Sequence, residues 1–79
     1  MISLIDAKKV VGLKQSKRAL KEGTALKAYL AKDADGDIAG LFEEACAQSG
    51  VELLSAESMS ALGDACGLDV GAAVAVLLK

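Results

Sequence analysis

The hydrophobic residues of two long segments recur with the spacing of a helix that buries one face. In residues 14–22, Ala19 and Leu20 stand among charged residues, and Gly23 is placed to end the helix. The second segment ends at Gly50, and its apolar residues recur at intervals of three and four, at Ile38, Leu41, Phe42, Ala45 and Cys46. We therefore predict two helices that each bury one face.

Two further helices are predicted. The same spacing in residues 58–65 directs Met59 and Leu62 inward, and Gly67 follows as the stop. Residues 3–9 are expected to form a short first helix. The chain has no proline, so glycines mark the ends of these blocks.

Short apolar runs between the helices predict four strands, at residues 10–11, 25–31, 51–54 and 72–78. The last run is continuously apolar, which is typical of a strand covered on both faces. Helices and strands then alternate, and this order predicts an α/β fold: a three-layer α/β/α sandwich with a small four-stranded mixed sheet. Because 79 residues leave room for one core, we predict a single domain over residues 1–79.

Charge is divided unevenly along the chain. Residues 1–32 hold eight of the nine basic residues and two of the eleven acidic residues, a net charge of +6, whereas residues 33–79 have a net charge of −8. A protein whose overall charge is −2 can still bind a polyanion, because the local potential acts over about 10 Å. The sequence therefore predicts a concentrated positive face.

Residues 12–18 place a glycine after a strand and then open a helix with polar and cationic side chains. A helix start carries free N–H groups and a partial charge of about +0.5, so it attracts phosphate, and basic residues there oppose the dipole. Helical spacing puts four cations on one face, namely Lys14, Lys17, Arg18 and Lys21. Gln15 lies beside them, and its amide can donate to and accept from a base edge. A solvated helix face would show the same charge pattern.

Three stretches carry a family resemblance: GLKQSKRAL at residues 12–20, AKDAD at residues 31–35 and LGDACGLDVGAA at residues 62–73. In order and spacing they resemble the kink-turn RNA-binding ribosomal-protein family, the superfamily of large-subunit ribosomal proteins seven-Ae and thirty-e. The Lys14-Gln15 pair looks most like its small bacterial kink-turn-binding branch, because archaeal members carry Asn-Glu there.

The resemblance implies an α/β/α domain without catalytic activity that binds the sharply bent RNA element called the kink-turn, in ribosomal RNA or in structured regulatory RNA. The residues that it places at the RNA are Gly12, Lys14, Gln15, Lys17, Arg18, Lys21, Lys32, Leu68, Asp69 and Val70. Residues 12–18 would enter the widened groove at tandem sheared G·A pairs. There Lys14, Gln15 and Arg18 would contact guanine edges and the nearby backbone.

The other residues take separate roles by the same resemblance. Lys17 and Lys21 would face phosphates, residues 68–70 would pack on a nucleotide flipped out of the bulge, and Lys32 would lie close to the RNA. This division suits a kinked RNA, which crowds its phosphates and exposes unstacked bases.

An acidic run at residues 33–37 is similar in part to a calcium-binding EF-hand loop. The sixth position holds Ile38 where that loop needs glycine, so a turn followed by a helix cap from Asp35 or Asp37 is the favoured interpretation. We therefore expect no metal at this run.

The sequence also lacks the residues of common catalytic and zinc sites. It contains no histidine, and its two cysteines, Cys46 and Cys66, lie twenty positions apart, which predicts two buried free thiols. We expect no cofactor and no enzyme activity.

Two other classes of function are open. A protein-interaction module of a ribonucleoprotein would dock a basic partner on the acidic face within residues 33–57, and a metabolic enzyme domain would need a catalytic set that the sequence lacks. The first residues do not resemble a signal peptide, and no apolar stretch reaches the roughly 20 residues of a membrane span, so we expect a cytoplasmic protein with no membrane contact. A monomer is expected, because one core uses all the apolar blocks, and association with the ribosome is open.

Overall fold

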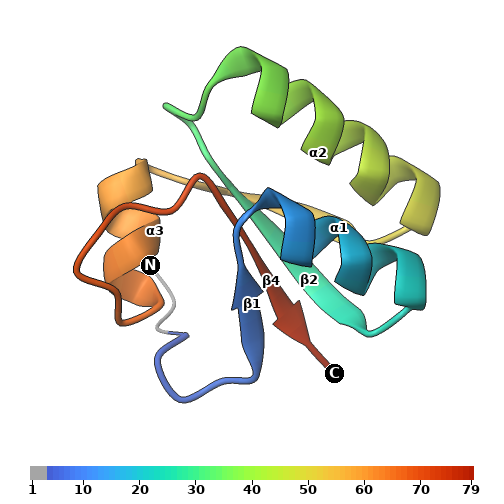
Figure 1. Cartoon of the computed structure of the whole chain (residues 1–79), viewed down its shortest axis with the longest axis horizontal. Helices are drawn as coiled ribbons and strands as arrows, with labels where there is room; N and C mark the ends of the chain where they lie inside the picture. Colours follow the sequence, from blue (N-terminus) through green and yellow to red (C-terminus); the bar gives the residue numbers. More distant parts are fainter. Residues whose placement is uncertain (1–3) are drawn as a thin grey trace.

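The computed structural model describes residues 4–79, and a four-stranded mixed sheet lies between two layers of helices (Figure 1). Along the chain the elements are β1 (Lys9–Val11), α1 (Leu13–Glu22), β2 (Ala25–Ala31), α2 (Gly36–Ser49), β3 (Glu52–Ala56), α3 (Met59–Ala65) and β4 (Val74–Leu78). The strand order is β1-β4-β2-β3, with β4 antiparallel to both neighbours and β3 parallel to β2. The predicted three-layer α/β/α sandwich is confirmed.

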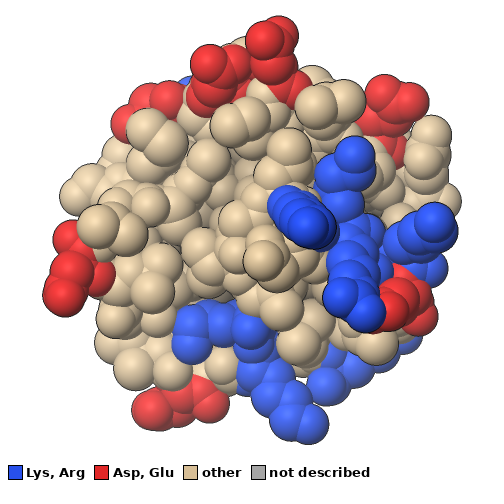
Figure 2. All heavy atoms as spheres, viewed as in Figure 1, with Lys and Arg blue, Asp and Glu red and all other residues tan. Residues whose placement is uncertain are grey.

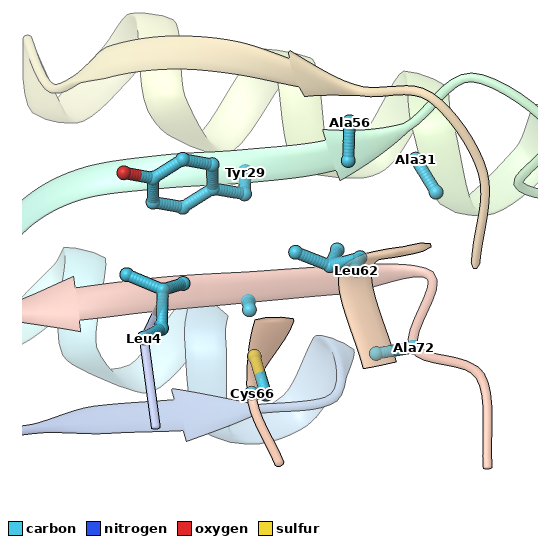
Figure 3. Close-up of a cluster of buried hydrophobic side chains, with 8 residues drawn as sticks. Leu4, Tyr29, Ala31, Ala56, Leu62, Cys66 and Ala72 are labelled. Atoms are coloured by element: carbon cyan, nitrogen blue, oxygen red, sulfur yellow. The ribbon is translucent and has the colours of Figure 1, made fainter. Parts of the chain in front are cut away.

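Buried side chains fill one layer on each face of the sheet. The cluster under α1 and α2 includes Ala19, Leu20, Phe42, Cys46, Val74 and Val76. On the other face, Leu62 of α3 and Cys66, which follows α3, pack together with Leu4 against Tyr29 and Ala75 (Figure 3). Alternate residues of β4 enter the two clusters, so this strand is covered on both faces, as predicted.

The polar loops gather at one end of the sheet. β1, β2 and β3 run toward this end, and β4 starts from it because it is antiparallel to β1 and β2. The Gly12 N–H donates to the Val74 carbonyl at 3.2 Å, and the Ala31 N–H donates to the Ala73 carbonyl at 2.9 Å. The loops that follow β1 and β2 therefore lie beside the loop that precedes β4.

The prediction of a helix over residues 3–9 is wrong. Residue 3 lies outside the described residues, and the others form a turn followed by the start of β1. The Leu4 side chain is buried, and the Leu4 N–H donates to the Ala65 carbonyl at 2.7 Å, which ties the turn to α3. The Lys8 carbonyl accepts a hydrogen bond from the last residue of β4 at 2.8 Å. Because this part of the chain pairs with the sheet, it does not form the predicted helix.

Two apolar side chains at predicted buried positions are exposed. Leu41 is 49% exposed and Met59 is 36% exposed, whereas Leu62 is fully buried as predicted. α2 lies over one sheet face, so a narrow stripe around Phe42 suffices to cover the core. Met59 is the first residue of α3, where its side chain lies at the margin of the core beside Gly71.

The strand boundaries shift by one or two residues. The strand predicted at residues 51–54 is β3, which begins one residue later and ends two residues later. The strand predicted at residues 72–78 begins only at Val74. The Ala72 N–H donates instead to the Met59 carbonyl at 2.9 Å, which binds this part of the chain to α3 rather than to the sheet.

The acidic run after β2 serves the starts of two helices. The Asp35 carboxylate accepts from the Asp37 N–H at 2.9 Å and caps α2, and the Asp33 carboxylate accepts from the Met59 N–H at 2.7 Å at the start of α3. The interpretation as a turn followed by a helix cap is confirmed.

Both cysteines are buried and free, as predicted. Burial raises the pKa of the Cys46 thiol, and the charge of Glu43 raises it further. Burial also raises the pKa of the Cys66 thiol, against a smaller lowering by Lys9. The two thiols therefore stay protonated at neutral pH and act as core residues.

None of the helices in residues 4–79 has the length and apolar character that a membrane span requires.

Candidate nucleic-acid interface

The outer face of α1 is strongly basic. The side chains of Lys14, Lys17, Arg18 and Lys21 are all exposed, whereas Ser16, Ala19 and Leu20 on the opposite side are buried. Basic side chains accordingly gather over α1 in Figure 2. The structure thus brings the four predicted cations onto one solvent-exposed face of α1, which is called the basic face below.

One ion pair lies within the basic face. Arg18 Nε and Glu22 Oε2 are 3.4 Å apart, and both side chains are more than half exposed. Exposed pairs of this kind are worth only about 0.3 to 0.5 kcal/mol on a helix, so the pair leaves Arg18 available to a stronger anion. Lys14, Lys17 and Lys21 form no ion pair with the residues that the structure describes.

The start of α1 has no side-chain cap. Gly12 precedes it with a φ of 99°, a conformation that side chains rarely adopt, and the first turn contains no acidic residue. Gln15 folds back toward this glycine, because a Cβ added to Gly12 would lie 3.3 Å from the Gln15 Oε1 atom. The first turn therefore presents backbone N–H groups, the Gln15 amide and the Lys14 ammonium group together.

The loop between α3 and β4 is held down on α3 by close backbone contact. A Cβ on Gly63 would collide with the Val70 carbonyl oxygen and lie 3.0 Å from the Gly71 Cα. The Leu68 N–H donates to the Gly63 carbonyl at 2.9 Å. The glycine in α3 therefore allows this loop to lie flat against the helix.

The three predicted residues of this loop have different exposures. Val70 is 70% exposed and Asp69 is exposed, whereas Leu68 is half-buried and packs against the core cluster around Leu62. Val70 is therefore the apolar side chain of the loop that a partner can reach most freely, and Leu68 anchors the loop.

The sheet brings most of the predicted residues to one end of the molecule. Gly12 is hydrogen-bonded to Val74, the first residue of β4, which follows the loop that contains Val70. Lys32 is exposed at the end of β2, which is the neighbour of β4. Lys21 is the exception, because seven residues of helix put it about 10 Å along α1 from Lys14.

A groove runs between α1 and α2, and the sequence analysis missed it. Its volume is about 650 Å³, and its lining consists of Lys14, Lys17, Arg18, Leu20, Lys21, Ala45, Gln48 and Ser49. The residues from α2 carry no charge and follow no motif, so only the packing of α1 against α2 reveals them.

A sequence profile of the ribosomal protein L7Ae/L30e/S12e/Gadd45 family matches residues 3–79 of this chain. The chain belongs to this family. The resemblance that three motifs indicated in the sequence is confirmed.

Relatives of this L7Ae-family chain match it over most of their length. An RNA-binding protein of Geobacillus sp. (strain WCH70) is 44% identical over 72 residues, which cover 91% of this chain and 88% of the relative. RNA-binding protein YbxF of Geobacillus stearothermophilus is 42% identical over 70 residues, which cover 89% of this chain and 85% of the relative.

The fold also recurs in solved structures. The 15.5kD RNA binding protein of Giardia lamblia superposes with a TM-score of 0.83 at 30% identity over 90% of this chain, and the chain spans 60% of that protein. A Bacillus halodurans protein of unknown function superposes with the same TM-score at 18% identity, over 90% of this chain and 71% of that protein, which shows the fold alone.

Proposed function

We propose that this protein binds RNA and recognises the kink-turn, and that it stabilises the bent form of the RNA. One observation carries the proposal: the uncapped, basic start of α1 lies at the same end of the sheet as the exposed Val70 loop. Relatives that are named as RNA-binding proteins support the first half of the proposal.

The chemistry of the two parts fits the two features of a kinked RNA. Bringing two stems together crowds phosphates, and the four cations of the basic face relieve that repulsion. Unstacked bases in the bulge need an apolar or peptide surface, which Val70 and the flat loop beneath it provide. A straight duplex offers the cations a phosphate backbone but offers the loop no free base.

Within this proposal Lys14, Gln15 and Arg18 contact base edges and the nearby backbone, and Lys17 and Lys21 neutralise phosphates. The Gln15 amide, held over Gly12, is both a donor and an acceptor at the start of the helix. Recognition of particular bases needs such a group, because a contact between a cation and a phosphate carries no information about sequence.

The remaining predicted residues act at the margin of the proposed interface. Lys32 extends the positive charge toward the end of β2, and Asp69 and Leu68 shape the loop that carries Val70. The mechanism is a shift of population: RNA samples open and kinked forms, and a protein that contacts only the kinked form favours it by its difference in affinity.

A gel-shift titration tests the proposal with two RNAs that differ only at the kink. One is a kink-turn, and the other has its G·A pairs replaced by Watson–Crick pairs, so both carry the same number of phosphates. We expect tight binding to the kink-turn and weak binding to the replaced RNA at one physiological salt concentration. Equal binding to both RNAs, or no binding to either, would overturn the proposal.

A further inference from the structure

We propose that the groove between α1 and α2 is a second RNA contact, which holds the phosphate backbone of one paired stem. The inference rests on the proposed function, because the stem belongs to the RNA whose kink lies at the start of α1. It adds α2 to an interface that the sequence motifs confine to α1 and to two loops.

The two walls of the groove differ in charge. The α1 wall contains all four cations of the basic face, and the α2 wall contains Ala45, Gln48 and Ser49, which are neutral. The acidic residues nearby on α2, Glu43 and Glu44, do not line the groove. The residues that line the groove are therefore basic or neutral, and the groove fits an anionic ligand.

The α2 wall can add hydrogen bonds to this charge. Gln48 Nε2 lies 3.4 Å from Glu44 Oε1, at the long limit of a hydrogen bond, so the Gln48 amide can turn toward a ligand at little cost. The Ser49 hydroxyl lies next to it at the end of α2. Neutral donors of this kind commonly bind phosphate oxygens beside lysines.

The dimensions and the place of the groove favour a nucleic-acid backbone. Lys14 and Lys21 lie about 10 Å apart along α1, so the basic wall is long enough to contact more than one phosphate of a strand. The groove extends from Lys14 at the start of α1 to Gln48 and Ser49 at the end of α2, so it leads away from the sheet end that carries Val70. An RNA strand that continues from the kink at Lys14 along the groove therefore reaches the α2 wall in the paired stem.

The experiment uses two substitutions that introduce the same side chain at adjacent positions of α2, one in the groove and one outside it. Gln48→Glu puts a negative charge in the groove, four residues after Glu44, and Ala47→Glu puts the same charge on the adjacent exposed position, four residues after Glu43. Both variants place two carboxylates four residues apart on α2, and Gln48→Glu also loses the long hydrogen bond to Glu44, so urea denaturation of both variants measures their folding stability.

Each variant and the native protein are titrated with three kink-turn RNAs. In the short-stem RNA both stems are just long enough to pair. In each of the two long-stem RNAs, one of the two stems is longer by one helical turn. We expect the native protein to bind one of the long-stem RNAs more tightly than the short-stem RNA. Gln48→Glu is expected to remove this gain and to weaken binding of the long-stem RNA about two- to fivefold, the effect of one exposed charge interaction. Ala47→Glu is expected to preserve the gain.

A reversed pair of substitutions guards against loss of folding as the cause. Gln48→Lys is expected to strengthen binding of the same long-stem RNA, and Ala47→Lys is expected to change it less. Equal effects at the two positions, or no gain from either longer stem, would overturn the groove contact while tight kink-turn binding leaves the proposed function intact. Failure of the native protein to prefer the kink-turn would overturn both.

Discussion

Helices α1 and α2 pack against each other and start at the same end of the sheet, but their starts are built in opposite ways (Figure 1). At α2 the Asp35 carboxylate caps the helix and Asp37 adds a negative charge in the first turn. At α1 there is no side-chain cap, no acid, and a lysine in the first turn. The start of α2 therefore stabilises the protein, whereas the start of α1 leaves its N–H groups and charges to a partner.

The two helices are alike in their ends and in their buried faces. Both end at a glycine in the left-handed conformation, Gly23 with a φ of 77° and Gly50 with a φ of 67°. Both bury a stripe of apolar residues in the same core cluster. The contrast thus lies in the starts and in the exposed faces.

The largest effect is expected in the shared core. Phe42 is fully buried, so Phe42→Ala should lower the free energy of unfolding by about 3 to 5 kcal/mol. Its neighbour Leu41 is half-exposed, and Leu41→Ala should change that free energy by less than about 0.5 kcal/mol. Urea denaturation measures both. Similar losses for the two variants would mean that α2 does not pack as described.

The next effect concerns the basic face of α1. Arg18→Ala should weaken kink-turn binding by about 1 to 3 kcal/mol, because a contact to a base edge is lost. Folding stability should change little, since the ion pair with Glu22 is exposed. Titration by gel shift measures the first quantity, and urea denaturation measures the second.

Lys8→Ala is the matched control for Arg18→Ala. Lys8 is exposed, lies before β1 and carries the same charge, so its loss tests for a general electrostatic effect. Equal weakening by the two variants, or equal weakening by Arg18→Ala on a straight duplex, would contradict a specific role for Arg18.

The sequence predicted the two helices that differ here, including the cap of α2, because caps and periodic apolar residues are local signals. The basic face followed from spacing alone. The groove did not, because Gln48 and Ser49 carry no signal until α2 is placed beside α1. The helix predicted near Leu4 failed for a related reason: pairing with β4 and docking on α3 are contacts with residues far along the chain.

The loop before β4 shows the same limit. Its motif indicated an RNA contact for Leu68, Asp69 and Val70 alike, but the structure separates them by exposure, since Leu68 packs into the core. The collision that a side chain on Gly63 would cause is also a tertiary property. The spacing of residues in the sequence predicts neither the burial of Leu68 nor the close contact at Gly63.

A smaller effect is expected at the start of α2. Asp35→Ala removes the hydrogen bond to the Asp37 N–H and should cost about 0.5 to 2 kcal/mol of stability without changing kink-turn affinity. Asp37→Ala removes a charge but keeps the cap, and should cost only about 0.3 to 1 kcal/mol. Thermal or urea unfolding compares the two variants. A greater cost for Asp37→Ala would show that charge, and not the hydrogen bond, stabilises this start.

The smallest expected change in stability is an increase, and it tests the difference between the two helix starts. Lys14→Glu gives α1 the acidic first turn that it lacks, so it should raise the free energy of unfolding by about 0.3 to 1 kcal/mol and weaken kink-turn binding. Lys21→Glu, in the last turn of the same helix, makes the same charge change and should lower stability instead. A loss of stability in both variants would contradict the claim that the start of α1 favours binding at the expense of stability.

The most direct measurement follows the shape of the RNA. A kink-turn labelled with a fluorophore at the end of each stem is titrated with the protein, beside the same RNA with its G·A pairs replaced. We predict that energy transfer rises to saturation for the kink-turn and stays unchanged for the replaced RNA, because the protein favours the bent form. Binding without a rise in energy transfer, or an equal rise in both RNAs, would contradict recognition of the kink.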